Sequence, residues 1–357
     1  MHRLVLLTAV LCLAMAGGSF AFHDAGVARC SGCHTMHNSE NGTPVDPNSA
    51  NGNPWLLKDA TPSDVCLGCH ATSRGAEFSV TVLTPSTEQG AGNFIFLLED
   101  NLNDGRAGSA AIPGDAAGHN LKAPGYGLAP DATLGSAPGA AAGGAAFPAS
   151  EMGCSSCHDP HGNEHFRLLY GAGASIQDGL YTFTNAAPSA VGLGLNDVEA
   201  NNLHTAYMGG MSAWCGNCHG DFHSNDVKLI HPSGVTIGGT IATAYNLYNG
   251  TSDQTGGNAA TAFLAAVPFE DAAMTTTSTE GPTALSQVSC ITCHRAHATS
   301  APNAGRWDFN VGGPEADGFT SGSWKIPNPY DVYQRSLCNK CHVKDAGDEL
   351  VDWTPVP

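Results

Sequence analysis

The chain has 357 residues, of which 32 are acidic and 14 are basic, so its formal net charge is −18 at neutral pH. Binding to nucleic-acid phosphates requires clustered lysine and arginine, so this charge balance excludes a nucleic-acid-binding protein. Only 13% of the residues are charged and 7% are aromatic, while 44 glycines and 21 prolines interrupt the sequence. This composition excludes long helices and continuous sheets, and it predicts a fold that is mostly coil with few short helices and very little strand.

Residues 1–21 have the pattern of a secretory signal peptide. Arg3 precedes an apolar run from Leu4 to Ala16, and the residues Ser-Phe-Ala that end at Ala21 form a suitable cleavage site. The run is too short to span a bilayer, and no later segment has the length of a transmembrane helix. We therefore expect an exported protein. Cleavage would leave 13 basic and 32 acidic residues, a net charge of −19.

Twelve of the 13 cysteines follow one pattern, Cys-x-x-Cys-His, which occurs six times and is numbered here motif 1 to motif 6 in chain order. In this pattern the two thiols form thioethers with haem, and the adjacent histidine binds the iron. Zinc sites and disulfide frameworks do not require a histidine after every second cysteine. The sequence therefore predicts six haem c groups. The attachment and proximal iron-binding residues are Cys30, Cys33 and His34; Cys66, Cys69 and His70; Cys154, Cys157 and His158; Cys215, Cys218 and His219; Cys290, Cys293 and His294; and Cys338, Cys341 and His342.

The motifs are distributed over the whole of residues 22–357, which predicts a single domain wrapped around a chain of stacked haems. A short acidic tail, about residues 345–357, follows the last motif. A chain so rich in glycine and proline has little apolar core of its own, so we expect haem binding and folding to be coupled.

The intervals between the motifs contain few elements. Between motifs 2 and 3, the apolar run Phe94–Leu98 predicts a short strand, and the Ala/Gly/Pro-rich residues 107–150 predict a surface loop. Between motifs 4 and 5, short helices are expected at residues 240–248 and 258–266.

The second iron ligand decides between electron transfer and catalysis, and histidines are available for this role. Four of them closely follow a motif: His37, His161, His223 and His297. The peptide of each motif is tied to the near face of its own haem, so these four are expected to bind the iron of another haem. His119 and His231 are further candidates, whereas His165 and His204 are expected to be bystanders.

Several segments together resemble the outer-surface hexahaem cytochromes of the OmcS type. They are FHDAGVARCSGCHTMHNSENG, CSSCHDPHG, MSAWCGNCHGDFH, IHPSG, CITCHRAHA and YQRSLCNKCH, within residues 22 to about 345. The resemblance implies two histidines on every iron and polymerisation into an extracellular filament, with His37 donated to the haem at His294 of the neighbouring subunit. The other distal ligands that it implies are His23, His119, His161, His223, His231 and His297. There are thus seven candidate distal histidines for six irons, so one of the seven histidines must have another role.

The function expected from these features is extracellular electron transfer along a head-to-tail filament, by a protein that is not an enzyme. Its partners would be copies of itself, other redox proteins or extracellular electron acceptors. A monomeric periplasmic electron shuttle would share the haem chemistry and differ only in assembly. A multihaem reductase of nitrite or sulfite would need one iron with an open face beside a basic pocket, whereas all six motifs end in histidine and basic residues are scarce.

Overall fold

The computed structural model describes most of the chain between the first and last motifs. The described residues are 29–71, 90–98, 114–138, 146–194, 197, 199–223, 233–250, 252–307, 328–330 and 335–342. The expected signal peptide, His23, His231 and the acidic tail lie outside them.

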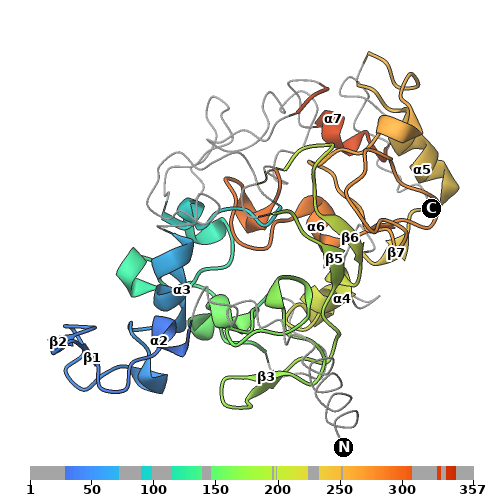
Figure 1. Cartoon of the computed structure of the whole chain (residues 1–357). Helices are drawn as coiled ribbons and strands as arrows, with labels where there is room; N and C mark the ends of the chain where they lie inside the picture. The colour runs from blue at the N-terminus through green and yellow to red at the C-terminus, as the bar shows by residue number, and fades with distance from the viewer. Residues whose placement is uncertain are drawn as a thin grey trace, which may run out of the picture.

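The described part consists of short elements joined by long irregular segments, which confirms the fold class predicted from composition (Figure 1). The α-helices are α2 (Cys30–Cys33), α3 (Pro62–His70), α4 (Met211–Cys215), α5 (Gly238–Leu247), α6 (Cys290–Cys293) and α7 (Arg335–Cys338). The strands form antiparallel pairs, β1 (Ser39–Glu40) with β2 (Thr43–Pro44), β3 (Ser175–Ile176) with β4 (Tyr181–Thr182), β5 (Ser189–Val191) with β6 (Ala206–Gly209), and β7 (Val235–Thr236) with β8 (Gln287–Val288).

Short 3-10 helices are numerous. They are η1 (Pro54–Leu56), η2 (Phe94–Leu98), η3 (Gly114–Ala116), η4 (Pro124–Tyr126), η5 (Ala149–Glu151), η6 (Cys154–Ser156), η7 (Phe166–Leu168), η8 (Gly220–His223), η9 (Ala259–Thr261) and η10 (Pro302–Ala304). Within the described ranges, no helix is long and apolar enough to cross a membrane.

The helix expected at residues 240–248 is confirmed as α5, whereas the one expected at 258–266 is wrong. Only η9 forms there, because the following backbone N–H groups donate to partners outside the segment. The amide of Leu264 donates to the Tyr245 hydroxyl (3.1 Å), and that of Ala265 donates to the Asn201 side chain (3.0 Å). These bonds replace the i to i−4 bonds that a helix would require.

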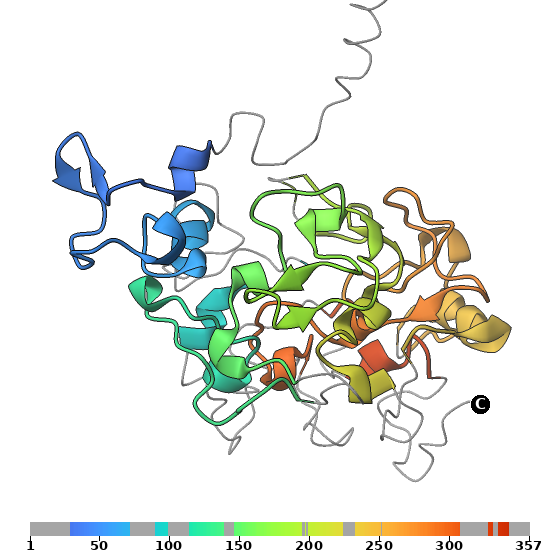
Figure 2. The same cartoon turned by 90° about the horizontal axis from the view of Figure 1, so that it is seen from below.

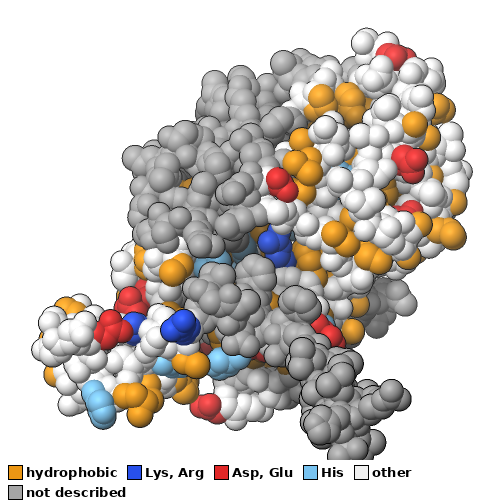
Figure 3. Space-filling model, in the orientation of Figure 1, with side chains coloured by type: hydrophobic (Ala, Val, Ile, Leu, Met, Phe, Trp, Pro, Cys, Tyr) orange, Lys and Arg blue, Asp and Glu red, His pale blue; other side chains and the backbone are white. Residues whose placement is uncertain are grey.

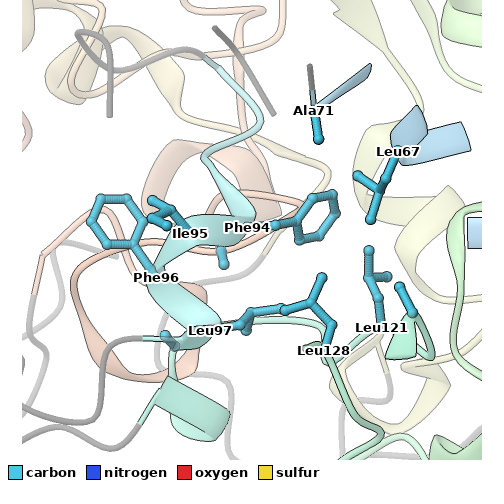
Figure 4. Packing of buried hydrophobic residues seen from close by; sticks show 11 residues of the cluster. Leu67, Ala71, Phe94, Ile95, Phe96, Leu97, Leu121 and Leu128 are labelled. Atoms are coloured by element: carbon cyan, nitrogen blue, oxygen red, sulfur yellow. The ribbon is translucent and has the colours of Figure 1, made fainter. Parts of the chain in front are cut away.

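The strand predicted at Phe94–Leu98 is also wrong, because these residues form η2 inside a buried apolar cluster. Figure 4 shows Phe94 pointing toward Leu67 of α3 and Leu97 lying beside Leu128. A short apolar run buried on several sides has no periodicity that separates strand from helix. The surface loop predicted for residues 107–150 is partly wrong, because Leu121, Ala123, Leu128 and Phe147 are buried.

The first described residues form an N-terminal arm, residues 29–57, which contains α2, β1 and β2. The arm lies at one end of the molecule and α5 lies at the opposite end, in both views (Figures 1 and 2). Three large apolar side chains of the arm are exposed: Met36 (73%), Trp55 (63%) and Leu56 (49%). On the face drawn in Figure 3, the described basic side chains are scattered and form no patch. The arm therefore exposes three large apolar side chains.

Candidate haem-binding sites

Motifs 1, 3 and 5 share one local structure. Each begins with a single helical turn over its first cysteine (α2, η6 or α6), and its histidine pairs with a later residue in an isolated antiparallel bridge. The bridged pairs are His34 with Leu57, His158 with Leu169 and His294 with Gly305. The same motifs are those in which a second histidine follows three residues after the first.

A short left-handed turn precedes each bridged partner. We call η1, η7 and η10 the left-handed turns, because each contains two consecutive non-glycine residues with φ between 52° and 59°. The residue pairs are Trp55 and Leu56, Arg167 and Leu168, and Asn303 and Ala304. This conformation costs free energy for residues with a side chain, so its repetition indicates a common requirement.

Each left-handed turn places a backbone carbonyl within hydrogen-bonding distance of the Nδ1 atom of a proximal histidine. The Nδ1 atoms of His34, His158 and His294 lie 2.9, 2.7 and 2.9 Å from the carbonyl oxygens of Trp55, Arg167 and Asn303. A carbonyl partner fixes the proton on Nδ1, which leaves Nε2 unprotonated and directed elsewhere. The left-handed turns therefore orient three proximal histidines for binding a metal through Nε2. In motif 4, the Pro138 carbonyl is placed likewise, 2.7 Å from His219 Nδ1.

Motifs 2 and 4 each pack against the motif that follows. The Ser63 hydroxyl of α3 accepts a hydrogen bond from the backbone amide of Cys154 (3.1 Å). The Ser212 hydroxyl of α4 accepts one from the backbone amide of Cys290 at the same distance. Each serine stands three residues before the first cysteine of its own motif. The described chain thus contains two equivalent junctions, one between motifs 2 and 3 and one between motifs 4 and 5.

Three pairs of histidine rings lie at a separation that suits one iron. Two imidazoles on opposite faces of a metal place their ring centres about 6–6.5 Å apart, because each metal–nitrogen bond is about 2 Å long. The observed ring-centre distances are 6.3 Å for His34 and His161, 6.3 Å for His158 and His297, and 5.9 Å for His219 and His119. In each pair, one member is a proximal histidine and the other is a predicted distal ligand.

Burial keeps four histidines, His119, His158, His294 and His297, in the neutral form that binds metals. It lowers the pKa of His119, His158 and His294, and together with the neighbouring His158 and His119 it lowers the pKa of His297 to about 3. The His119 ring is further fixed because its Nδ1 lies 2.6 Å from the Ala296 carbonyl. No proton therefore has to leave these rings before iron binds at neutral pH.

The other histidines are placed differently. His37 is exposed on the N-terminal arm, and His223 ends η8, with its side chain outside the described part. His204 is buried against Phe263, with ring centres 3.5 Å apart, and both of its ring nitrogens lie within 2.8 Å of backbone carbonyls. His165 is exposed, and its Nδ1 lies 3.0 Å from the Leu169 carbonyl. Both rings are thus bonded to backbone carbonyls of their own chain.

The haem attachment residues fit the group. All twelve motif cysteines are described and none is in a disulfide, so every thiol is available for a thioether. Within the described ranges, no three His, Cys, Asp or Glu side chains are grouped so that they could hold a metal ion without a cofactor. When bound, the haem iron supplies one-electron chemistry between its ferric and ferrous states. The thiols and the paired histidine rings are the groups that would hold it, and the turn carbonyls would orient the proximal histidines.

Charged side chains are buried around motifs 4 to 6, and no sequence pattern indicated this. Glu270 is 2% exposed and accepts the Met211 amide (2.9 Å), Arg306 is fully buried, and Lys340 is 1% exposed. Burial raises the pKa of Glu270 and lowers that of Lys340 to about 8.

The Glu270→Gln variant should be more stable than the wild type at pH 7, by about 1–3 kcal/mol, because the neutral amide removes the cost of burying a carboxylate charge. One oxygen of Glu270 accepts the Met211 amide, while Oε2 has no partner among the described residues. The raised pKa means that the folded state holds the proton more tightly than the unfolded chain, so the wild type gains stability as the pH falls.

The difference should therefore shrink toward pH 4.5, which urea unfolding followed by haem absorbance would measure. Glu151→Gln, at a half-exposed carboxylate, is the matched control and should change little. A Glu270→Gln variant less stable than the wild type at pH 7 would contradict this account of the site.

Comparisons with known proteins agree with this geometry. The family described as "Doubled CXXCH motif" matches residues 147–178, which contain motif 3. The "C-type cytochrome OmcS" of Geobacter sulfurreducens is 32% identical over 93% of this chain and 96% of its own length. Two solved structures from the same organism each cover 91% of this chain and 100% of theirs. They are an "Outer Membrane Cytochrome S Filament" (31% identity, TM-score 0.73) and "OmcS nanowires" (29% identity, TM-score 0.74). With its attachment motifs, its paired histidines and this similarity over nearly its whole length, the chain belongs to the OmcS family of c-type cytochromes.

Proposed function

We propose that the chain conducts electrons through six haem c groups, each bound by two histidines, and that copies of it join head to tail into an extracellular filament. It is an electron-transfer protein and not an enzyme. The observation that carries the proposal is the set of three histidine pairs, each about 6 Å between ring centres. An iron with both faces occupied has no open position for a substrate, so it exchanges electrons only.

The histidine pairs follow a rule along the chain. The second histidine of motif 3, His161, faces the proximal histidine of motif 1, and the second histidine of motif 5, His297, faces that of motif 3. The second histidine of motif 1, His37, has no earlier motif in its own chain to face. By the same rule its iron belongs to motif 5 of another copy, at His294.

The surface around His37 supports this placement. His37 is exposed on the N-terminal arm, and the same arm presents the apolar side chains of Met36, Trp55 and Leu56 to solvent. An exposed apolar surface of this kind favours a protein contact. A contact between two different surfaces that does not close into a ring extends without limit, which gives a filament. The solved relatives are described as a filament and as nanowires, which supports the same assembly here.

The candidates for the distal ligands of motifs 2 and 6 can be reduced to three histidines. With His161, His297, His119 and His37 assigned, the haems of motifs 2 and 6 take their second ligands from His23, His223 and His231. One of these three is then the candidate without an iron.

Three measurements on the secreted, oxidised protein test the proposal. A haem assay should give six haems per chain, electron paramagnetic resonance should show only low-spin iron, and electron microscopy should show filaments. A high-spin signal would indicate an open iron face and favour the reductase. Low-spin iron in discrete particles under all growth conditions would favour the monomeric shuttle.

A further inference from the structure

Motif 6 differs from the other five motifs in the residues between its cysteines. Those residues are uncharged in motifs 1 to 5, whereas motif 6 reads Cys-Asn-Lys-Cys and places Lys340 directly before the second attachment cysteine. The side chain of Lys340 is 1% exposed, so its charge is inside the protein and next to the position of one haem.

The groups around Lys340 bind its ammonium through carbonyl oxygens and aromatic rings, and no acidic side chain is paired with it among the described ion pairs. Its Nζ donates to the carbonyls of Tyr245 (2.9 Å) and Tyr248 (3.4 Å) at the end of α5. It also lies 4.3 Å from the ring centre of Tyr245 and 5.5 Å from that of Tyr330, positions that favour a cation. Among the described ion pairs, none joins an acidic side chain to Lys340.

Capping of α5 does not by itself account for a buried charge. A lysine near a helix end binds the last carbonyls equally well with its ammonium in water, where the charge is not desolvated. A neutral donor would satisfy the same carbonyls without the cost of burying a charge. What the ammonium adds is an electrostatic potential, which is strong here because the surroundings are apolar and screening is weak.

We propose that the Lys340 ammonium raises the reduction potential of the haem attached at Cys338 and Cys341, so that this haem is the preferred electron site of each subunit. A nearby positive charge stabilises the reduced haem, which carries one positive charge fewer than the oxidised haem. Two other buried charged side chains lie beside motifs: Arg306 beside motif 5, where a positive charge would raise the potential, and Asp64 in the helix of motif 2, where a negative charge would lower it. This inference rests on the proposed attachment of a haem at motif 6, but not on filament formation.

The test compares the haem-loaded full chain with Lys340→Gln, Lys340→Met and Lys340→Arg variants in a spectroelectrochemical titration at pH 6. The glutamine variant removes the charge but keeps an N–H donor for the α5 carbonyls, and the arginine variant keeps the charge. The matched control is Lys122→Gln, which removes a half-exposed lysine. Haem content is measured first, because a chain with five haems would contradict the proposed function rather than this inference.

In the glutamine and methionine variants, the component of highest potential should lose at least tenfold in its reduction equilibrium constant, which is 59 mV for one electron. The other components should move less, and the Lys340→Arg and Lys122→Gln variants should keep the wild-type curve. If the methionine variant does not load haem, the glutamine and arginine variants carry the comparison. An unchanged curve for a fully loaded Lys340→Gln variant, or an equal shift in Lys340→Arg, would overturn the inference.

Discussion

The His37→Ala variant should secrete as single subunits that keep all six haems but form no filaments. His37 is exposed on the N-terminal arm, so its loss leaves the packing of its own subunit intact. At the proposed contact between copies, its loss removes an iron ligand from the haem at His294. Electron microscopy should show particles instead of filaments, and one haem in six should become high-spin.

The control for this variant is His165→Ala. His165 is also exposed, and its Nδ1 lies 3.0 Å from the Leu169 carbonyl of the same chain, so its removal should leave both the filaments and the spectrum unchanged. Wild-type filaments from the His37→Ala variant would show that the contact between subunits does not use this ligand. Loss of filaments in both variants would show that assembly responds to any change of a surface histidine.

The His297→Ala variant should convert the haem of motif 3 to a high-spin form and loosen the packing between motifs 3 and 5. The His297 ring lies 6.3 Å from that of His158 and stacks on Phe94 at 4.5 Å, so it joins two distant parts of the chain. Its pKa of about 3 keeps it neutral, so the bond to iron should persist well below pH 6 in the wild type. Electron paramagnetic resonance measures the spin state of the variant, and its pH dependence in the wild type measures how long the bond to iron persists.

His297→Met separates ligation from packing. A methionine thioether can also bind haem iron, and a histidine–methionine pair has a higher potential than two histidines. This variant should therefore remain low-spin and show one haem at raised potential. If all six haems remain low-spin in the His297→Ala variant, His297 is not the ligand opposite His158.

Much of the chemistry could be predicted from sequence because covalent attachment requires fixed residues at fixed spacing. The six motifs specify the thiols and proximal histidines, and the spacing of His161 and His297 after their motifs pointed to bonds with other haems. Both of these rings indeed lie beside the proximal histidine of another motif. The pairing of His119 with His219 has no local sequence signal, because the two residues are far apart in the chain.

The parts that could not be predicted depend on tertiary contacts. The left-handed turns use Trp55, Arg167 and Asn303, none of which is the glycine that such a conformation usually favours. Their common purpose, a carbonyl directed at a proximal histidine, appears only when the two segments are together. The apolar run at Phe94–Leu98 was misassigned because burial from several sides removes the periodicity on which a strand prediction depends.

The two equivalent junctions, between motifs 2 and 3 and between motifs 4 and 5, indicate that the chain contains a repeated structural module. The serine contact that joins motif 2 to motif 3 recurs between motifs 4 and 5, so the natural module is a pair of motifs rather than the whole polypeptide. If motif 6 of one copy packs against motif 1 of the next, the array has three modules per chain, and the third junction uses another contact because Arg335 stands at the position of the serine. A circularly permuted chain that starts at motif 3 would then build the same array, and a chain with one module fewer would shorten the axial repeat by a third.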